Sequence, residues 1–93
     1  MIMNKAIKLI IQGRVQGVGY RRWFEQQALA LELKGYVKNL ATGEVEAVIV
    51  GDFDVLQDLI SRSYDGPPHA EVVKVIQIVL DHEPDFIVFT MLS

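Results

Sequence analysis

The order of hydrophobic patterns along the chain is the feature that most constrains its fold. Residues 21–33 have helical periodicity, with Phe24, Ala28 and Leu31 on one side, and a second helical pattern follows Gly51-Asp52. Stretches of alternating or β-branched residues typical of strands stand before, between and after these two segments. Because each helix must bury its apolar side, this order predicts one sheet with both helices packed on one face.

Five stretches are predicted to be strands, and with the helices they give the order βαββαβ plus a short C-terminal strand. Two helices on one face of an antiparallel sheet form an α+β two-layer sandwich of the ferredoxin-like type. Many unrelated functions use this arrangement, so it does not by itself indicate an activity. The predicted strands are Ala6–Gly13, Tyr36–Leu40, Glu44–Val50, Val72–Leu80 and Phe86–Met91.

The second helix has local signals at both ends. Asp52 is expected to be its N-cap, because a carboxylate can accept hydrogen bonds from the first free amides of a helix. Gly66-Pro67-Pro68 ends the segment, since proline cannot continue a helix. The buried stripe is predicted to consist of Leu56, Leu59, Ile60 and Ser63.

The strand before this helix has two different faces. Val45, Ala47 and Ile49 share one side, which we expect to face the core, while Val48 and Val50 share the other side with Glu44 and Glu46. If exposed, the two valines would form an apolar strip that could pair subunits.

The composition excludes several classes of function. The 93 residues suffice for one compact domain, so residues 1–93 are predicted to form a single unit. No apolar run reaches the about 18 residues needed to span a membrane. The sequence has no cysteine, which excludes disulfides and thiol catalysis and fits a cytoplasmic protein. A net charge of −3 argues against nonspecific binding to nucleic acid.

The glycine-containing loop from Gly13 to Arg21 is the most informative stretch for function. It joins a predicted strand to the start of a helix, where free backbone amides and the helix dipole favour an anion. Gly17 and Gly19 let the chain curl so that successive amides converge. The loop lacks the Lys-Ser/Thr pair of a P-loop, and Arg22 stands where a dinucleotide fingerprint needs a small residue.

Arg21 breaks a local rule. A cation in the first turn of a helix opposes the dipole, at a cost of about 0.3–1 kcal/mol, and such conflicts often mark functional sites. At about 100° per residue, Arg21 lies on the same side as Phe24 and Ala28 and is expected to reach over the loop, while Arg22 points to solvent. The alternative is that both arginines are solvated surface charges.

Motifs spread over most of the chain resemble those of the acylphosphatase family, from about residue 6 to about residue 90. Four residues differ from those common in the family. Tyr20 replaces the common phenylalanine, Tyr36 and Lys38 replace the commoner Trp and Arg, and Glu32 replaces a glycine at the end of the first helix. A positive φ at Glu32 would cost about 1 kcal/mol. The matching motifs are Gly13-x-Val15-Gln16-Gly17-Val18-Gly19-Tyr20-Arg21, Ala28, Gly35-Tyr36-Val37-Lys38-Asn39, Gly43-x-Val45-Glu46 and Gly66-Pro67-Pro68-x-Ala70-x-Val72.

The resemblance implies an enzyme that hydrolyses acyl phosphates to a carboxylate and inorganic phosphate, without metal or cofactor. By motif position the catalytic residues are Arg21 and Asn39. Arg21 and the loop amides are expected to hold the phosphoryl group and Asn39 to orient the water, with the substrate phosphate taking the proton. We expect a monomer that binds small acyl phosphates, with phosphate or sulfate as product-like ligands, and neither nucleic acid nor membrane. The phosphate-binding residues are Val15, Gln16, Gly17, Val18, Gly19 and Tyr20.

Two alternatives belong to other classes of protein. The first is a noncatalytic module of the same family that binds phosphate or carbamoyl phosphate. The second is a single-stranded RNA binder, which would need a basic surface and exposed sheet aromatics, whereas this chain is acidic. His69 and His82 are far apart and have no ligand-spaced partners, so a metal site is not expected.

Overall fold

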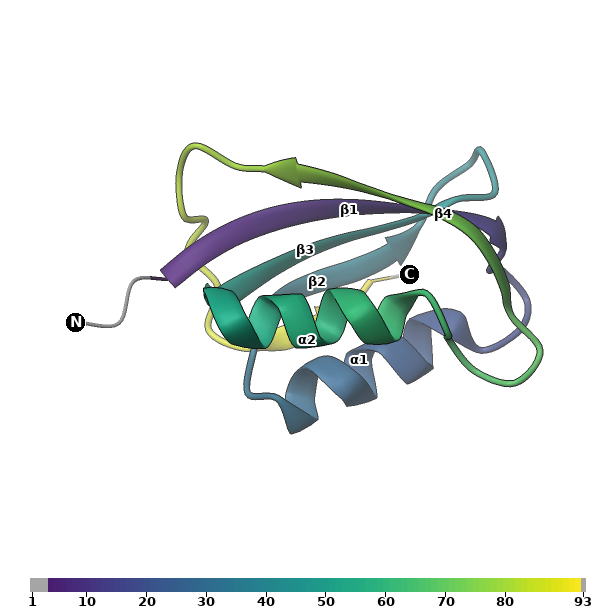
Figure 1. Cartoon of the computed structure of the whole chain (residues 1–93), viewed down its shortest axis with the longest axis horizontal. Coiled ribbons are helices and arrows are strands. Elements are labelled where there is room, and N and C mark those ends of the chain that lie inside the picture. Colours follow the sequence, from purple (N-terminus) through teal and green to yellow (C-terminus); the bar gives the residue numbers. More distant parts are fainter. Residues whose placement is uncertain (1–3, 93) are drawn as a thin grey trace.

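Two helices lie side by side on one face of a five-stranded sheet in the computed structural model, which describes residues 4–92 (Figure 1). The arrangement confirms the predicted two-layer α+β sandwich. Neither helix has the length and hydrophobicity that a membrane-spanning helix requires. The elements are β1 (Asn4–Arg14), α1 (Tyr20–Ala30), β2 (Lys34–Asn39), β3 (Val45–Asp52), α2 (Phe53–Ser63), β4 (Glu71–Val79) and β5 (Phe89–Met91).

The strand order in the sheet is β4-β1-β3-β2-β5. The four long strands are antiparallel as predicted, but β5 pairs with β2 in parallel, with Gly35 opposite Phe89, so the sheet is mixed. The prediction of a wholly antiparallel sheet was wrong at this edge. β4 runs opposite to β2, and a chain that reverses after β4 to reach the far edge must run in the same direction as β2.

The main core fills the space between the helices and the sheet. All four α2 residues predicted from helical spacing are buried, and three of them, all but Ser63, belong to this core. From β3 the core takes Val45, Ala47 and Ile49. The α1 contribution is Tyr20, Phe24 and Ala28. Complete burial of one large apolar side chain contributes about 1.5–3 kcal/mol, so this layer supplies most of the stability.

The outer face of β3 carries a second, smaller core. Val48 and Val50 are only 5% and 3% exposed, and they pack with Ala6 against Tyr36, Leu80 and Phe86. The two valines therefore do not form an exposed apolar strip, because the segment after β4 covers them. Phe86, predicted to begin the last strand, belongs to this cover instead.

Glu46 is buried beside this small core and joins three strands. Its carboxylate accepts a hydrogen bond from the Tyr36 hydroxyl at 2.8 Å and lies 3.3 Å from Lys8 Nζ and 3.5 Å from Lys38 Nζ. Burial raises the pKa of Glu46, but the hydrogen bonds from Tyr36 and Lys8 and the two lysine charges outweigh burial and leave the pKa below its usual value. The group ties β1, β2 and β3 together on the side away from the helices.

The end of α1 differs from the prediction. The helix stops at Ala30 rather than near Leu33, and Glu32 adopts a positive φ of 57°. The Leu33 amide then donates to the Ala28 carbonyl at 3.0 Å, which closes the helix end. The anticipated strain at Glu32 is therefore present, about 13 residues away from the loop at the other end of the helix.

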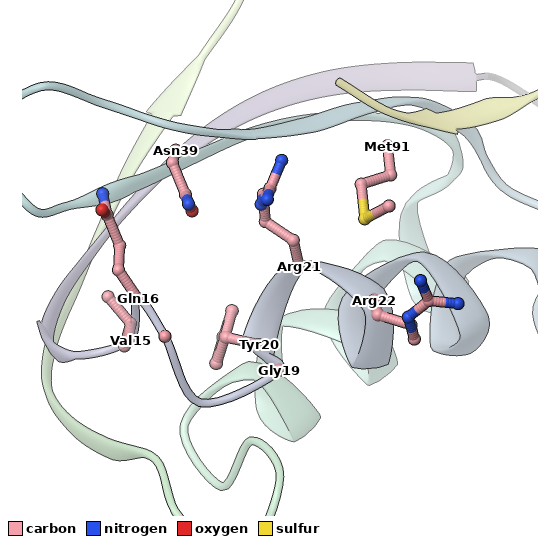
Figure 2. A pocket seen from close by; sticks show the side chains of 9 residues that line it. Val15, Gln16, Gly19, Tyr20, Arg21, Arg22, Asn39 and Met91 are labelled. Atoms are coloured by element: carbon pink, nitrogen blue, oxygen red, sulfur yellow. The ribbon is translucent and has the colours of Figure 1, made fainter. Parts of the chain in front are cut away.

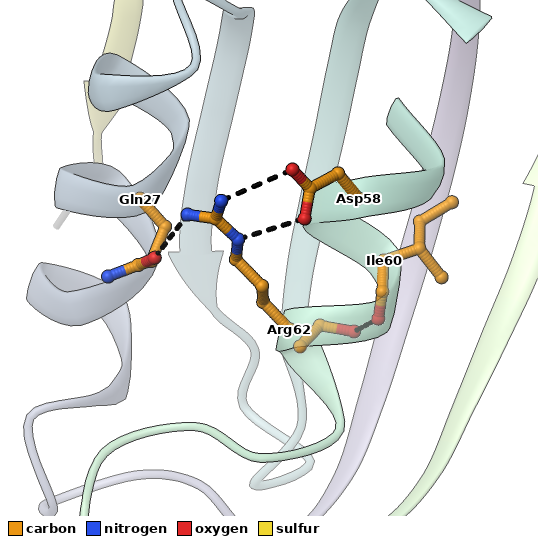
Figure 3. A network of polar contacts seen from close by, with 5 residues as sticks. Gln27, Asp58, Ile60 and Arg62 are labelled. Carbon is orange, nitrogen blue, oxygen red and sulfur yellow. Dashed lines mark hydrogen bonds and ion pairs between the residues drawn. The ribbon is translucent and has the colours of Figure 1, made fainter. Parts of the chain in front are cut away.

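A polar bridge joins the two helices (Figure 3). Arg62 of α2 donates to Asp58 Oδ1 at 3.0 Å and Oδ2 at 3.2 Å, one turn earlier, and to Gln27 Oε1 of α1 at 2.9 Å. The guanidinium is fixed by the carboxylate on its own helix and is thereby presented to the neighbouring helix. This bridge holds α1, which carries the loop described below, against α2.

Candidate active site

A pocket of about 200 Å³ lies where the β1–α1 loop, the end of β2 and the end of β5 meet (Figure 2). Seven of the eight predicted site residues line it; the exception is Val18, which packs against the core instead. Arg22 and Met91 also line the pocket and were not predicted to do so. The full lining is Val15, Gln16, Gly17, Gly19, Tyr20, Arg21, Arg22, Asn39 and Met91.

The two glycines of the loop are needed for conformation rather than for space. Gly17 and Gly19 have φ values of 74° and 82°, and a Cβ added at either would meet no atom within 4 Å. An L-residue pays about 1–2 kcal/mol in this left-handed region, whereas glycine adopts it freely. The curled loop is thus encoded by glycine at these two positions.

The amides at the start of α1 are free to bind an anion. The first helical hydrogen bond runs from the Trp23 amide to the Gly19 carbonyl at 3.0 Å. Within residues 4–92, the amides of residues 17–22 donate to no other group, and the first turn has no acidic side chain. Free donors and an uncompensated dipole at the same place favour negative charge.

Gln16 fastens the loop to the neighbouring hairpin. Its side-chain amide donates to the carbonyls of Leu40 and Glu44, both at 2.8 Å. Because both donated hydrogen bonds of this amide go to the β2–β3 turn, the Gln16 side chain positions the loop, and its backbone faces the pocket.

Tyr20 also contributes only its backbone. Its ring is buried and its hydroxyl donates to the Ser63 carbonyl at 2.7 Å, at the end of α2. Burial raises the pKa of the Tyr20 phenol, so the hydroxyl stays protonated and keeps this bond. The Tyr20 hydroxyl thus anchors the loop to the end of the second helix.

Arg21 extends from the start of α1 towards the strand ends and lies beside Asn39 (Figure 2). Its guanidinium donates to the carbonyl of Leu92. The segment that offers this carbonyl is itself fixed: the Met91 amide donates to Glu25 Oε2 at 2.9 Å, and the Leu92 amide donates to the Val37 carbonyl at 2.8 Å. The residue that directly follows β5 therefore holds the arginine.

Sequence reasoning missed this role of the C-terminal segment. The available signal was Glu25, which lies one helical turn after Arg21 on the same side of α1. The group that Glu25 binds, however, is the amide of Met91, which lies 66 residues further along the chain.

Asn39 stands at the end of β2, across the pocket opening from the loop (Figure 2). Its Oδ1 atom is buried and has no hydrogen-bond donor among the described residues. Leaving such an acceptor unpaired costs about 1–3 kcal/mol, so most buried polar atoms have a partner. The arrangement offers a buried acceptor to a small polar molecule beside the loop.

The other charged residues near the loop differ in position. Arg22 is exposed, as expected, yet it borders the pocket, whereas Arg14 is exposed and does not. His69 and His82 are exposed and lie outside the pocket. Within the described part of the chain, no three His, Asp or Glu side chains are grouped so that they could hold a metal ion.

Comparison with known proteins gives a consistent result. The family model named Acylphosphatase matches residues 7–91. The chain is 38% identical over 82 residues to an acylphosphatase from Azorhizobium caulinodans, covering 88% of each chain. Its fold is similar to an acylphosphatase from Coxiella burnetii (TM-score 0.90, 34% identity, 95% of this chain and 92% of that one). It is also similar to one from Bacillus subtilis (TM-score 0.93, 28% identity, 98% and 100%).

Proposed function

Since the chain belongs to the acylphosphatase family and is a hydrolase of acyl phosphates, we propose that the pocket bordered by Arg21 and Asn39 is its active site. The observation that carries this assignment is the buried, unpaired Asn39 Oδ1 atom, which lies beside the Arg21 guanidinium. The free amides of the loop line the same pocket. Among the described residues, no other pocket side chain has a buried polar atom without a hydrogen-bond partner.

The reaction needs little chemical help from the protein. Water attacks phosphorus, the bond between phosphorus and the acyl oxygen breaks, and a carboxylate leaves; an acyl phosphate dianion and water become a carboxylate and dihydrogen phosphate. Because a carboxylate is stable at neutral pH, the leaving group needs no general acid. What remains is to neutralise charge on the phosphoryl oxygens and to align the water.

Arg21 and the loop amides perform the first task. The amides from Val15 to Tyr20 and the start of α1 donate to the phosphoryl oxygens, and the planar guanidinium bridges two of them. Because Arg21 is already fixed by the Leu92 carbonyl, little reorganisation is needed when substrate binds.

Asn39 performs the second task. Its Oδ1 accepts a hydrogen bond from the attacking water and so places the water opposite the leaving oxygen. The pocket lining contains no Asp, Glu or His that could take the proton. The proton of the water therefore passes to a phosphoryl oxygen of the substrate.

The remaining expectations belong to the same proposal. Inorganic phosphate and sulfate bind as product-like ligands in the loop, and the chain acts as a cytoplasmic monomer without a metal ion. Phosphate titration of the purified protein tests the binding, and light scattering tests whether it is a monomer.

The decisive experiment is hydrolysis of benzoyl phosphate with a chelator present. Catalytic turnover that is unaffected by the chelator supports the proposal. Binding of phosphate without turnover would instead identify a noncatalytic phosphate-binding module of the same family. Dependence of turnover on an added divalent cation would also contradict the proposal.

A further inference from the structure

Part of the pocket lining has no task in the mechanism above. Arg22 and Met91 border the pocket, but the phosphoryl group is held by the loop amides and Arg21. Both side chains lie on the far side of Arg21 from Asn39 (Figure 2). The pocket lining therefore includes one cationic and one apolar side chain that do not hold the phosphoryl group.

The direction of attack determines what occupies this part of the pocket. In phosphoryl transfer the attacking and leaving oxygens lie roughly in line on opposite sides of phosphorus. If Asn39 places the water, the leaving carboxylate and the acyl group attached to it point away from Asn39. That direction leads past Arg21 to Arg22 and Met91.

The charge of Arg22 is available to a ligand. Arg22 is exposed and forms no ion pair within residues 4–92. Glu25, the acidic residue one turn later, uses its Oε2 atom for the Met91 amide. Arg22 is thus a second cation at the pocket that neither the fold nor the phosphoryl group uses.

We propose that Arg22 recognises a negative charge on the acyl group, so that the enzyme prefers acyl phosphates whose acyl part carries a second anionic substituent. This inference rests on the proposed function and names the substrate class for the same site. Met91 forms the apolar wall along which the uncharged part of the acyl group lies. Arg22 is a specificity residue and takes no part in the bond changes.

A pair of matched substrates tests this preference. Benzoyl phosphate and 3-carboxybenzoyl phosphate differ only in one carboxylate, and the rigid ring prevents the intramolecular anhydride formation of short flexible diacids. The measured quantity is the ratio of kcat/KM for the charged substrate to that for the neutral one. Comparing this ratio between variants cancels the intrinsic reactivity of each substrate.

We expect Arg22→Gln to lower the ratio about two- to fivefold at low ionic strength, the range for one exposed ion pair. Arg22→Lys keeps most of the preference, and added salt reduces it in the wild type by screening. Arg14→Gln is the matched control, because Arg14 is an exposed arginine at the same end of the sheet that does not border the pocket. It leaves the ratio and the activity unchanged.

Two results would overturn the inference while leaving the proposed function intact. An unchanged ratio in Arg22→Gln means that Arg22 does not read the acyl group. An equal loss of kcat/KM for both substrates means that Arg22 acts on the phosphoryl group. If the wild type hydrolyses neither substrate, the proposed function fails and the inference fails with it.

Discussion

The two helices begin in opposite ways. α2 is capped by its own chain: Asp52 accepts a hydrogen bond from the Asp54 amide at 3.0 Å, and Asp54 adds an acidic side chain in the first turn. The N-cap of α1 is Gly19, which has no side chain to accept a hydrogen bond. The first turn of α1 has no acidic residue and carries Arg21 instead. A side chain of the protein thus accepts a hydrogen bond from a first-turn amide of α2, whereas the first amides of α1 remain free for a ligand.

The start of α2 contributes to stability, whereas the start of α1 gives up this contribution and is proposed to bind the substrate. A side-chain cap is worth about 0.5–2 kcal/mol, and α1 does without it. The unfavourable cation at the start of α1 is held instead by a distant carbonyl, that of Leu92. The local preferences for helix starts are thus satisfied at α2 and violated at α1, where a ligand is proposed to bind. Four substitutions, given in order of expected effect, test this contrast.

Removing the cation at the start of α1 has the largest effect. Arg21→Ala is expected to lower kcat/KM for benzoyl phosphate by about 10³–10⁵-fold, because an arginine clamp stabilises the transition-state charge. Steady-state kinetics measure this loss, and phosphate affinity falls with it. Arg14→Ala should stay within about twofold of wild type. A variant of Arg21 that retained wild-type kinetics would show that the open start of α1 has no catalytic role.

The next substitution tests whether the uncapped start of α1 is sufficient for turnover or whether the Asn39 side chain across the pocket is also required. Asn39→Ala is expected to lower kcat by about 10²–10³-fold with little change in KM, because the water loses its acceptor while the phosphoryl group keeps its amides. Phosphate titration should give a dissociation constant close to that of wild type. A rise in KM at unchanged kcat would instead assign Asn39 to substrate binding.

An aspartate at the N-cap of α1 would give this helix the same kind of cap as α2. Gly19→Asp and Gly19→Asn share the strain of a left-handed side chain, which Asn and Asp tolerate best, and differ only in charge. Because a carboxylate competes with the anion for the free amides, the Asp variant should bind phosphate about tenfold more weakly than the Asn variant. Phosphate inhibition of benzoyl phosphate hydrolysis measures both. Equal inhibition constants would contradict anion binding at these amides.

Removing the cap of α2 should affect stability alone. Asp52→Ala is expected to cost about 1 kcal/mol of unfolding free energy, which lowers Tm by about 4–8 °C in a domain of this size. The kcat should stay within about twofold of wild type, because α2 begins at the opposite end of the sheet from the pocket. Asp85→Ala, which removes an exposed loop carboxylate, serves as the control. A large loss of activity without loss of Tm would show that the two helix starts are coupled.

Local patterns were sufficient to predict most of the fold. The four buried residues of α2 follow from helical spacing, and the Asp52 cap follows from side-chain chemistry next to the helix. Contacts between distant segments were not predictable in this way. The cover that Leu80 and Phe86 place over Val48 and Val50, and the parallel pairing of β5, depend on where a remote segment passes.

The candidate site shows the same division. The curl of the loop at its two glycines follows from local reasoning, which left open whether Arg21 was only a solvated surface charge. The family resemblance supplied Asn39, since nothing near it in sequence indicates that its Oδ1 would be buried and unpaired. The acceptor at Leu92 and the place of Arg22 beside Met91 required the three-dimensional structure.

The path of the chain from β4 at one edge of the sheet to β5 at the other has a consequence for folding. β1 lies in the interior of the sheet and pairs Ile7 with Val79, so its second neighbour arrives only with the far part of the chain. Contacts of such long sequence separation slow folding, because loop closure must precede them. The pocket needs β5 as well. We therefore expect catalytic activity to return in the last kinetic phase of refolding, and initial rates of hydrolysis to report complete assembly more strictly than circular dichroism.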